Sequence, residues 1–261
     1  MRVTLLITTY NWPEALELVL LSVVSQSVLP HEIMIADDGS TEDTKHLISK
    51  FKNELPVPLK HIWHEDVGFT KTIILNKALQ QITSDYIIQI DGDVILHKHF
   101  IKDHIRLSEE NTYLFGSRIS LKEEYSRKVL ANKTIKFHWI NNGLLRKSRA
   151  IYMPFFSKFL SKKSDKNSGK LRGCNMSYWK KDAIEINGYN QDLIGWGYED
   201  FNFAQRLLNS GVTSKRIKHV AIQFHIYHKE SPRGNTEVGD KIQIETQKNK
   251  ITKCKNGLVQ L

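Results

Sequence analysis

Short apolar runs alternate with segments of helical periodicity along the first hundred residues of the chain. The apolar runs predict β-strands at 3–8, 32–36, 59–63 and 86–90. The segments between them predict helices at about 13–25, 41–51 and 70–82, the first of which opens with Pro13. Strands that alternate with helices are typical of an α/β fold in which helices flank a mainly parallel central sheet.

The second half of the chain has a less regular pattern. It predicts a strand near 113–117, helices at 180–186 and 199–210, and a final strand at 220–224. The residues beyond Asp240 are polar, and we expect this tail to be partly disordered. The length suits a single domain, which we divide into a half at 1–105, a half at 106–240 and a polar tail at 241–261.

Polar residues follow three of the predicted strands. They are Thr8 and Tyr10 after the first strand, Asp37 and Asp38 after the second, and Asp91 and Asp93 after the fourth. In an open parallel sheet, ligands bind beyond the carboxyl ends of the strands. We therefore expect these side chains to meet at one edge of the sheet.

Asp91 and Asp93 have the chemistry of a divalent-cation site. They flank Gly92, which permits close approach of the backbone. Carboxylates, phosphate oxygens and imidazoles are ligands of Mg²⁺ or Mn²⁺, and such an ion can neutralise a departing diphosphate. The same Asp-Gly-Asp sequence is also common in turns that bind nothing.

Asp37 and Asp38 suit the nucleoside end of a nucleotide. Their carboxylates could accept hydrogen bonds from a uracil N–H or a ribose hydroxyl, although a turn before the next helix is an equally simple interpretation. The chain has no G-x-G-x-x-G after its first strand and no GxxxxGK[ST] loop, which disfavours dinucleotide enzymes and P-loop NTPases. A diphosphate would then depend on a metal ion and on basic groups such as Lys71.

A second polar group lies at 195–200, with the sequence GWGYED. Trp196 could stack on the apolar side of a sugar ring, and a carboxylate beside it, Glu199 or Asp200, could deprotonate a hydroxyl group. The alternative is a helix that begins with two acids, where the helix dipole favours negative charge, next to a tryptophan of the core.

Two pairs of histidines are spaced three residues apart. His225 and His228 could converge on a metal ion if the final strand ends or bends between them. His61 and His64 have the same spacing, and we interpret that pair as structural.

The charge and the cysteine content indicate which partners and which cellular compartment to expect. The net charge is +10, and residues 146–172 contain nine Lys or Arg and one acid, interleaved with aromatic and aliphatic residues. This segment suits either an anionic membrane surface or a flexible solvated loop, and it suits nucleic acid less well. No apolar run approaches the roughly 18 residues of a membrane span. Cys174 and Cys254 lie far apart, which suits reduced thiols in the cytosol.

Several of these motifs together resemble family 2 glycosyltransferases with the GT-A fold. The resemblance covers about residues 1–105 through 7–13 (ITTYNWP), 22–27 (SVVSQS), 36–40 (ADDGS) and 90–93 (IDGD). A second region is similar to the C-terminal part of beta-1,4-galactosyltransferases and bacterial chondroitin polymerases, through 173–177 (GCNMS), 188–189 (GY), 195–200 (GWGYED) and 225–228 (HIYH). Together the two resemblances imply a first half that binds the nucleotide sugar and a second half that binds the acceptor and is catalytic, with a basic insertion at 146–172.

The resemblance also implies a role for each motif residue. Uridine would contact Thr8, Tyr10 and Asp38, with Asp37 beside them, while Asp91 and Asn175 would face the donor. Asp93, His228 and His225 would hold the metal ion, Mn²⁺ or Mg²⁺. Asp200 would be the catalytic base, with Glu199 and Trp196 at acceptor-contacting positions. Tyr198 and Phe201 depart from the pattern of the galactosyltransferases, so the acceptor stays open.

The expected activity is an inverting transfer of a hexose from a UDP-sugar to a glycan or glycolipid. Galactose is our first choice of sugar, and GalNAc, GlcNAc and glucose are alternatives. We expect a role in bacterial surface polysaccharide or lipooligosaccharide synthesis, in the cytosol or on the inner face of the cell membrane. The rival interpretations are a sugar nucleotidyltransferase, which would need a glycine-rich loop after the first strand, and a non-enzymatic module that binds membrane or RNA.

Overall fold

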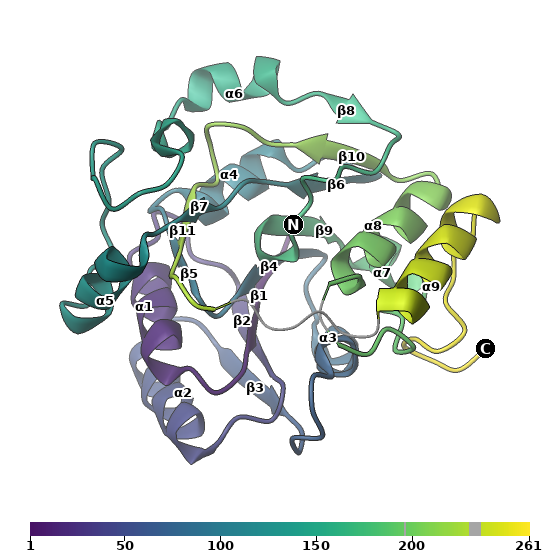
Figure 1. Ribbon diagram of the computed structural model, residues 1–261, viewed down its shortest axis with the longest axis horizontal. Coiled ribbons are helices and arrows are strands. Elements are labelled where there is room, and N and C mark those ends of the chain that lie inside the picture. The colour runs from purple at the N-terminus through teal and green to yellow at the C-terminus, as the bar shows by residue number, and fades with distance from the viewer. Residues whose placement is uncertain (196, 230–235) are drawn as a thin grey trace.

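The computed structural model describes residues 1–195, 197–229 and 236–261. The chain forms an α/β structure with one large and one small sheet (Figure 1). The large sheet contains, in spatial order, β3 (Leu59–Trp63), β2 (Glu32–Asp37), β1 (Val3–Thr9), β4 (Tyr86–Asp91), β9 (Met176–Trp179), β6 (Thr112–Phe115), β10 (Thr213–Arg216) and β8 (Lys163–Ser164). The small sheet contains β5 (Val94–Leu96), β11 (Gln223–His225) and β7 (Ile119–Ser120).

The large sheet is mainly parallel, as the sequence predicts. Strands β3, β2, β1 and β4 run in one direction, whereas β9 runs antiparallel to both β4 and β6, and β8 runs antiparallel to β10. The four strands predicted for the first half end within one residue of the observed bounds. All seven residues of β1 are buried, because the strand has neighbours on both sides and helices over both faces.

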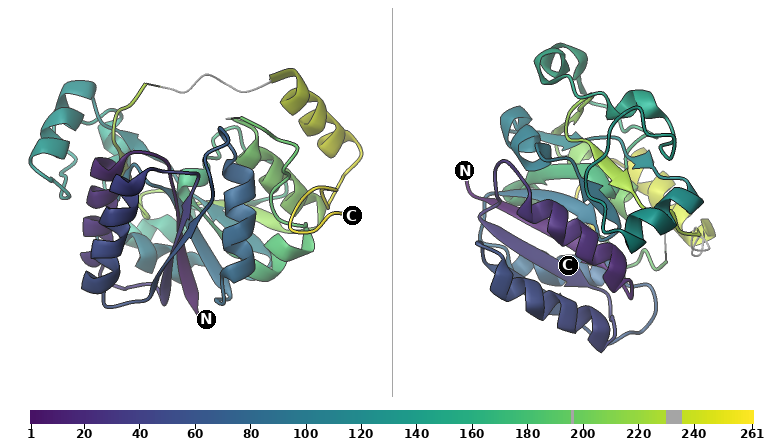
Figure 2. Two further views of the ribbon diagram at one scale, coloured as in Figure 1. Left: turned by 90° about the horizontal axis from the view of Figure 1, so that it is seen from below. Right: turned by 90° about the vertical axis from the view of Figure 1, so that its left-hand side faces the viewer.

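The described part of the chain contains helices on both faces of the large sheet and at its periphery (Figure 2). They are α1 (Pro13–Val24), α2 (Glu42–Glu54), α3 (Lys71–Gln81), α4 (Phe100–Leu107), α5 (Glu123–Ala131), α6 (Pro154–Leu160), α7 (Lys180–Glu185), α8 (Glu199–Asn209) and α9 (Thr236–Lys248), with short 3₁₀ turns η1 (Lys147–Ala150) and η2 (Gly173–Asn175). One core joins Leu5 and Ile7 of β1 to α1, α2 and α4, and the other joins Leu6 to α3, α7 and α8. The left view of Figure 2 shows α1 and α2 on one side of the sheet and α3 on the other.

The expectation of a partly disordered tail after Asp240 was wrong. Residues 240–248 belong to α9, which packs beside α8 through polar contacts. Asn202 Nδ2 donates to Thr246 Oγ1 (3.0 Å), and Asn209 Nδ2 donates to Thr246 O (3.0 Å). This helix is fixed by hydrogen bonds rather than by an apolar stripe, so its sequence lacks the usual periodic signal.

Two further differences concern the second half. The final strand is shorter than the predicted 220–224 segment, because Ala221 has a φ of 44°, which no strand residue adopts. The basic region at 146–172 contains η1, α6 and β8. Within the described ranges, no helix combines the length and the apolar content of a membrane span.

Candidate active site

Asp93, His225 and His228 form a compact cluster beyond the end of β4. Strand β11 pairs with β5 so that His225 lies opposite Val94, next to Asp93. The Nε2 atoms of His225 and His228 lie 3.3 and 3.1 Å from Asp93 Oδ2. One possible ligand atom of each residue lies within 4.8 Å of the others. The bend after β11, where Ile226 N donates to Asp93 O (3.0 Å), lets two histidines three positions apart converge.

The cluster has the donor set of a divalent-metal site. Asp93 Oδ1 is buried and has no hydrogen-bond partner in the described part of the chain, so it is a carboxylate oxygen that lacks a cation or a donor. Although burial works against ionisation, hydrogen bonds from the two histidines hold the pKa of Asp93 below its usual range. Hydrogen bonding to Asp93 raises the pKa of His228. One carboxylate and two imidazoles fit Mn²⁺ better than Mg²⁺, which prefers oxygen ligands.

Asp91 faces a different set of partners from Asp93, because the chain turns at Gly92 between them. Asp91 Oδ1 accepts hydrogen bonds from Thr8 Oγ1 (2.8 Å) and from Lys71 Nζ (3.1 Å). Gly92 N donates to Thr8 O (2.7 Å), and a Cβ atom at this position would lie 2.9 Å from that oxygen. The close backbone approach expected of Gly92 is therefore confirmed.

Lys71 links the two acidic groups of the site. Its Nζ lies 3.1 Å from Asp91 Oδ1 and 3.7 Å from Glu199 Oε1, at the start of α8. Although burial works against the charge, the carboxylates of Asp91, Asp200 and Glu199 raise the pKa of Lys71 well above its usual value. Asp91 at the end of β4 and Glu199 at the start of α8 therefore contact the same cation, the ammonium group of Lys71.

Asp37 and Asp38 lie at the carboxyl end of β2, and each contacts one histidine. His61 Nε2 lies 2.8 Å from Asp37 Oδ2, and His64 Nε2 lies 2.8 Å from Asp38 Oδ1. Thr70 also donates to Asp38 from its backbone N–H (2.9 Å) and its hydroxyl (2.7 Å). The histidines interpreted as structural thus hold the two carboxylates in place, a role that their spacing alone does not reveal.

Tyr10 is the most accessible of the predicted donor-site residues. Its side chain is 52% exposed, and its hydroxyl donates to Asp66 Oδ2 (2.8 Å). A half-exposed ring at the edge of the sheet is free to stack on a planar group. Thr8, by contrast, is buried against Asp91.

Asp200 is held in the first turn of α8 by two N–H donors. Gly173 N donates to Asp200 Oδ2 (3.0 Å), and Gln89 Nε2 approaches Asp200 Oδ1 at 3.4 Å. Burial raises the pKa of Asp200 to about 7, with Lys71 working against this shift and Glu199 adding to it. A carboxyl group with a pKa near neutrality, fixed by donors and partly open, has the properties of a general base.

Gln89 is a site-supporting residue that the motifs do not reveal. It is fully buried in β4, and its Oε1 accepts hydrogen bonds from Tyr178 Oη (3.0 Å) and Tyr189 Oη (2.6 Å). These two bonds fix the amide so that its NH₂ group points to Asp200. One polar residue within an otherwise apolar buried strand was the available sequence signal.

The three remaining predicted site residues are Asn175, Trp196 and Glu199. Asn175 is fully buried, and its Nδ2 donates to Ser117 O (3.1 Å) and Ala221 O (3.0 Å), so that the side chain links loops beneath the site. Its contact with a donor stays a prediction. Trp196 lies outside the described residues, whereas Glu199 next to Asp200 is buried and accepts a hydrogen bond from Gly197 N (2.9 Å).

Replacement of Gly173 by alanine is expected to lower the turnover of this site by about a hundredfold. The Cβ atom would lie 2.1 Å from the carboxylate of Asp200, so the carboxylate must move, and for the catalytic base that the resemblance implies at Asp200 a displacement of about 1 Å is expected to cost about that factor. Gly169→Ala is the matched control, because no atom lies within 4 Å of its Cβ position. The measurement is the initial rate of product formation, and an unchanged rate in Gly173→Ala would exclude a role for this carboxylate position.

Comparisons with known proteins agree on one family. The sequence profile described as Glycosyl transferase family 2 matches residues 4–183, and the profile described as N-terminal domain of galactosyltransferase matches residues 154–229. The hyaluronan synthase of Pasteurella multocida is 23% identical over 95% of this chain, and the chondroitin synthase of Escherichia coli is 23% identical over 88%. This chain covers only 27% and 35% of the length of those two synthases.

Solved structures show the same fold at low sequence identity. Residues 1–349 of S. aureus TarS in complex with UDP-GlcNAc match 96% of this chain and 69% of that chain, with a TM-score of 0.62 and 16% identity. The mannosyltransferase PcManGT from Pyrobaculum calidifontis, in complex with GDP-Man and Mn²⁺, matches 88% of this chain and 58% of that chain, with a TM-score of 0.57 and 18% identity.

Proposed function

This chain belongs to glycosyl transferase family 2 and has the GT-A fold, and from this premise we propose that it transfers a hexose from a UDP-sugar to a hydroxyl group of an acceptor glycan. Galactose is the first candidate sugar, and GalNAc, GlcNAc and glucose are the alternatives. One observation carries the proposal: Lys71 Nζ lies 3.1 Å from Asp91, two residues before Asp93 of the cluster, and 3.7 Å from Glu199, the residue before Asp200, so that one cation joins the end of β4 to the start of α8.

The donor lies along the carboxyl ends of β1, β2 and β4 in this proposal. Asp37 and Asp38, oriented by their histidines, accept hydrogen bonds from the uracil and ribose, and Tyr10 stacks beside the base. Asp91 and Lys71 contact the sugar or the ribose and the diphosphate. The neighbours bind UDP-GlcNAc in one case and GDP-Man in another, so the choice of uridine rests on the carboxylates of this chain.

The reaction is a single displacement with inversion. Asp200 accepts the proton of the acceptor hydroxyl, the freed oxygen forms a bond to the anomeric carbon, and the bond to the diphosphate breaks with its electron pair on UDP. Gly173 and Gln89 keep the carboxylate of Asp200 in place through this step. Asp93, His225 and His228 would hold a divalent ion, which would supply positive charge close to the departing diphosphate. An α-linked donor sugar yields a β-linkage.

The acceptor in this proposal is a glycan or glycolipid that meets the chain beside α8. Glu199 precedes the proposed base in the first turn of α8, and its carboxylate, which also contacts Lys71 and Gly197 N, is proposed to accept a further hydrogen bond from an acceptor hydroxyl. Trp196 is proposed as a stacking surface for the acceptor sugar. We propose that the transfer serves the synthesis of a bacterial surface polysaccharide or lipooligosaccharide at the inner face of the membrane. Two relatives are named as synthases of polysaccharides, hyaluronan and chondroitin.

A screen of nucleotide sugars tests the donor assignment. In the presence of Mn²⁺, UDP-Gal is expected to be hydrolysed or transferred fastest, with UDP-GalNAc second, whereas GDP-Man should be inactive. Addition of a chelator should stop the reaction, and excess Mn²⁺ should restore it. Release of nucleoside diphosphate is the readout. Activity with non-uridine donors alone would overturn the roles given to Asp37 and Asp38.

A further inference from the structure

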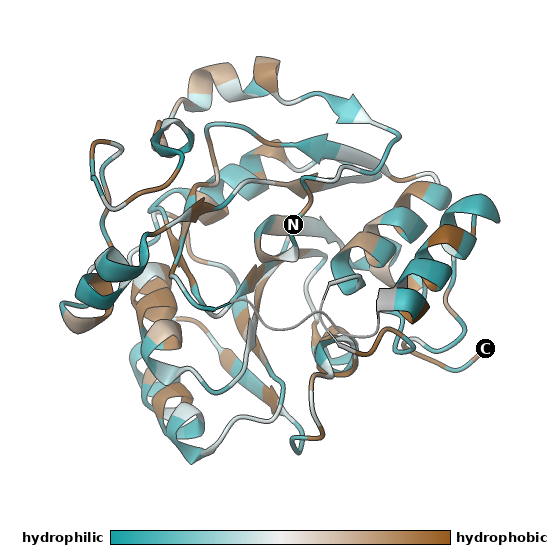
Figure 3. Cartoon of the chain, in the orientation of Figure 1, coloured by the Kyte–Doolittle hydropathy of each residue, from teal (hydrophilic) through white to brown (hydrophobic). Residues whose placement is uncertain are grey.

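Helix α6 presents a cluster of aromatic side chains to solvent. The side chains of Phe155, Phe156 and Phe159 are 76%, 55% and 71% exposed. Their rings are close to one another, with centroids 5.5 Å apart for Phe155 and Phe156 and 6.5 Å apart for Phe155 and Phe159. The apolar colour of α6 stands out along one edge of the molecule in Figure 3. Exposed apolar clusters of this kind mark sites that contact a partner or a membrane.

The outward direction of these rings is fixed by the opposite side of the helix. Ser157 is fully buried, and its hydroxyl accepts a hydrogen bond from Arg106 Nη2 of α4 (3.0 Å). Arg106 Nη1 also donates to Pro154 O (3.2 Å). Because Ser157 faces inward, Phe155, Phe156 and Phe159 must face away from the protein, so their exposure is a property of a docked helix.

Positive charge accompanies the aromatic cluster along this segment of the chain. Lys158, Lys162 and Lys166 are exposed, and none of them forms an ion pair with the described residues. Lys163 differs, because it pairs with Glu109 at 2.6 Å. Asp165 is the single acid between Lys158 and Lys170 in the sequence.

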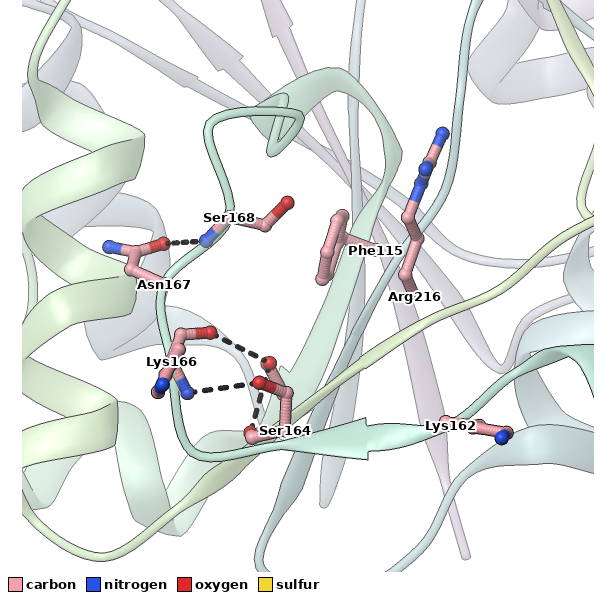
Figure 4. Close-up of a pocket in the computed structure, with 8 residues that line it drawn as sticks. Phe115, Lys162, Ser164, Lys166, Asn167, Ser168 and Arg216 are labelled. Atoms are coloured by element: carbon pink, nitrogen blue, oxygen red, sulfur yellow. Dashed lines mark hydrogen bonds between the residues drawn. The ribbon is translucent and has the colours of Figure 1, made fainter.

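A basic pocket lies beside β8 in the same segment (Figure 4). Its volume is about 230 Å³, and its walls include Lys162, Lys166 and Arg216, with no carboxylate from the described part of the chain. The Nε atom of Arg216 is buried and has no hydrogen-bond partner among the described residues. In Figure 4 the side chains of Lys162, Lys166 and Arg216 point in different directions, so the pocket adds positive charge to this segment without bringing the three cations together. Helix α6 and β8 follow one edge of the molecule (Figure 1).

We propose that this α6 face, made up of Phe155, Phe156 and Phe159 together with Lys158, Lys162 and Lys166, binds the surface of a bilayer that contains anionic phospholipid. The rings insert among the lipids at the interface, and the three lysines are attracted to headgroup phosphates. A second copy of the chain is a poorer fit, since docking two such faces would bring the same unpaired cations together. Exposed aromatic rings together with unpaired positive charge are the combination expected of a surface that binds anionic lipid.

The α6 face is connected directly to the acceptor side of the site. Asn167, which follows the lysines, donates through Nδ2 to Phe201 O (3.1 Å) in the first turn of α8, next to Asp200. A bilayer bound at this face therefore lies near the helix that carries the proposed base. This inference goes beyond the proposed reaction, and lipid binding can be measured without any donor or acceptor.

Flotation with lipid vesicles tests the proposal. The wild-type chain is expected to float with vesicles of 70% phosphatidylcholine and 30% phosphatidylglycerol at about 50 mM NaCl and to be released at about 500 mM, because salt screens the attraction. Each basic residue near an anionic surface strengthens binding roughly fivefold. Lys158→Ser/Lys162→Ser/Lys166→Ser should therefore lower the partition coefficient about a hundredfold, and Phe155→Ser/Phe159→Ser should lower it as well.

The matched control changes three exposed lysines elsewhere, on α2 and α9: Lys50→Ser/Lys52→Ser/Lys248→Ser. It loses the same charge and should bind vesicles like the wild type. Equal binding of the wild type and the Lys158 triple variant would overturn the proposal. So would a wild-type chain that ignores anionic vesicles, or one that forms a dimer through Phe155 and Phe159 in sedimentation velocity. All substituted side chains are exposed, and thermal melting checks that each variant is folded.

Discussion

Replacement of Asp200 by asparagine is expected to leave donor binding intact and to lower transfer by about 10²–10⁴-fold, the usual contribution of a positioned general base. The amide has nearly the same shape but cannot accept the acceptor's proton. Titration calorimetry with UDP-sugar and Mn²⁺ measures donor binding, and initial rates measure transfer. The exposed Asp43→Asn on α2 is the matched control for the change in charge.

The pH dependence adds a second signature of the same group. Burial raises the pKa of Asp200 to about 7, so the carboxyl group is protonated below that pH and ionised above it. Because only the ionised form accepts a proton, the ratio kcat/KM for the acceptor should fall as the pH drops through about 7. This limb should be missing from the residual activity of Asp200→Asn. Near-normal transfer by that variant, or a loss of donor binding, would show that Asp200 is not the base.

Replacement of Asp93 by asparagine is expected to impair the binding of Mn²⁺ and UDP-sugar, which Asp200→Asn leaves intact. Asp93 is the one carboxylate of its cluster, and its Oδ1 is buried without a partner in the described chain. Loss of a group that merely supports a metal ligand costs about 10–100-fold in affinity, so loss of an anionic ligand should weaken Mn²⁺ binding by at least about a hundredfold. UDP-sugar binding should weaken with it, and transfer should disappear.

The readout is Mn²⁺ titration with and without UDP-sugar, alongside His228→Ala as a second cluster variant and Asp43→Asn as the control. The two acidic residues should separate cleanly, since Asp200→Asn keeps Mn²⁺ and donor and Asp93→Asn loses both. If Asp93→Asn bound Mn²⁺ with wild-type affinity, the cluster would be an ordinary buried ion pair between a carboxylate and two histidines.

The first half of the fold could be predicted because its signals are strong. Strands β1 and β4 are buried on both faces, so they appear in the sequence as short, mostly apolar runs that end in polar residues. The parallel order then places the ends of β1, β2 and β4 together, which brings Thr8, Asp37 and Asp91 to one edge. The predicted meeting of these side chains is therefore a consequence of topology.

The remainder depended on contacts that periodicity does not encode. His61 and His64 reach Asp37 and Asp38 across neighbouring strands, and Gln89 reaches Asp200 from the middle of β4. Helix α9 packs through buried hydrogen bonds to amide side chains, which a polar sequence does not distinguish from a solvated tail. Helix α6 was not predicted, because its apolar side faces solvent, whereas the apolar side of a surface helix usually faces the core.

The pairing of β5 with β11 has a consequence for the order in which the protein folds during synthesis. This ladder joins Val94 to His225, so its two strands are separated by about half of the chain. The parallel strands β1 to β4 can form as soon as the first hundred residues leave the ribosome, but the ladder must wait until His225 and His228 have emerged. Contacts between such distant segments form slowly. A nascent chain therefore carries an incomplete cluster of Asp93, His225 and His228 until residue 228 has been made and β11 has paired with β5.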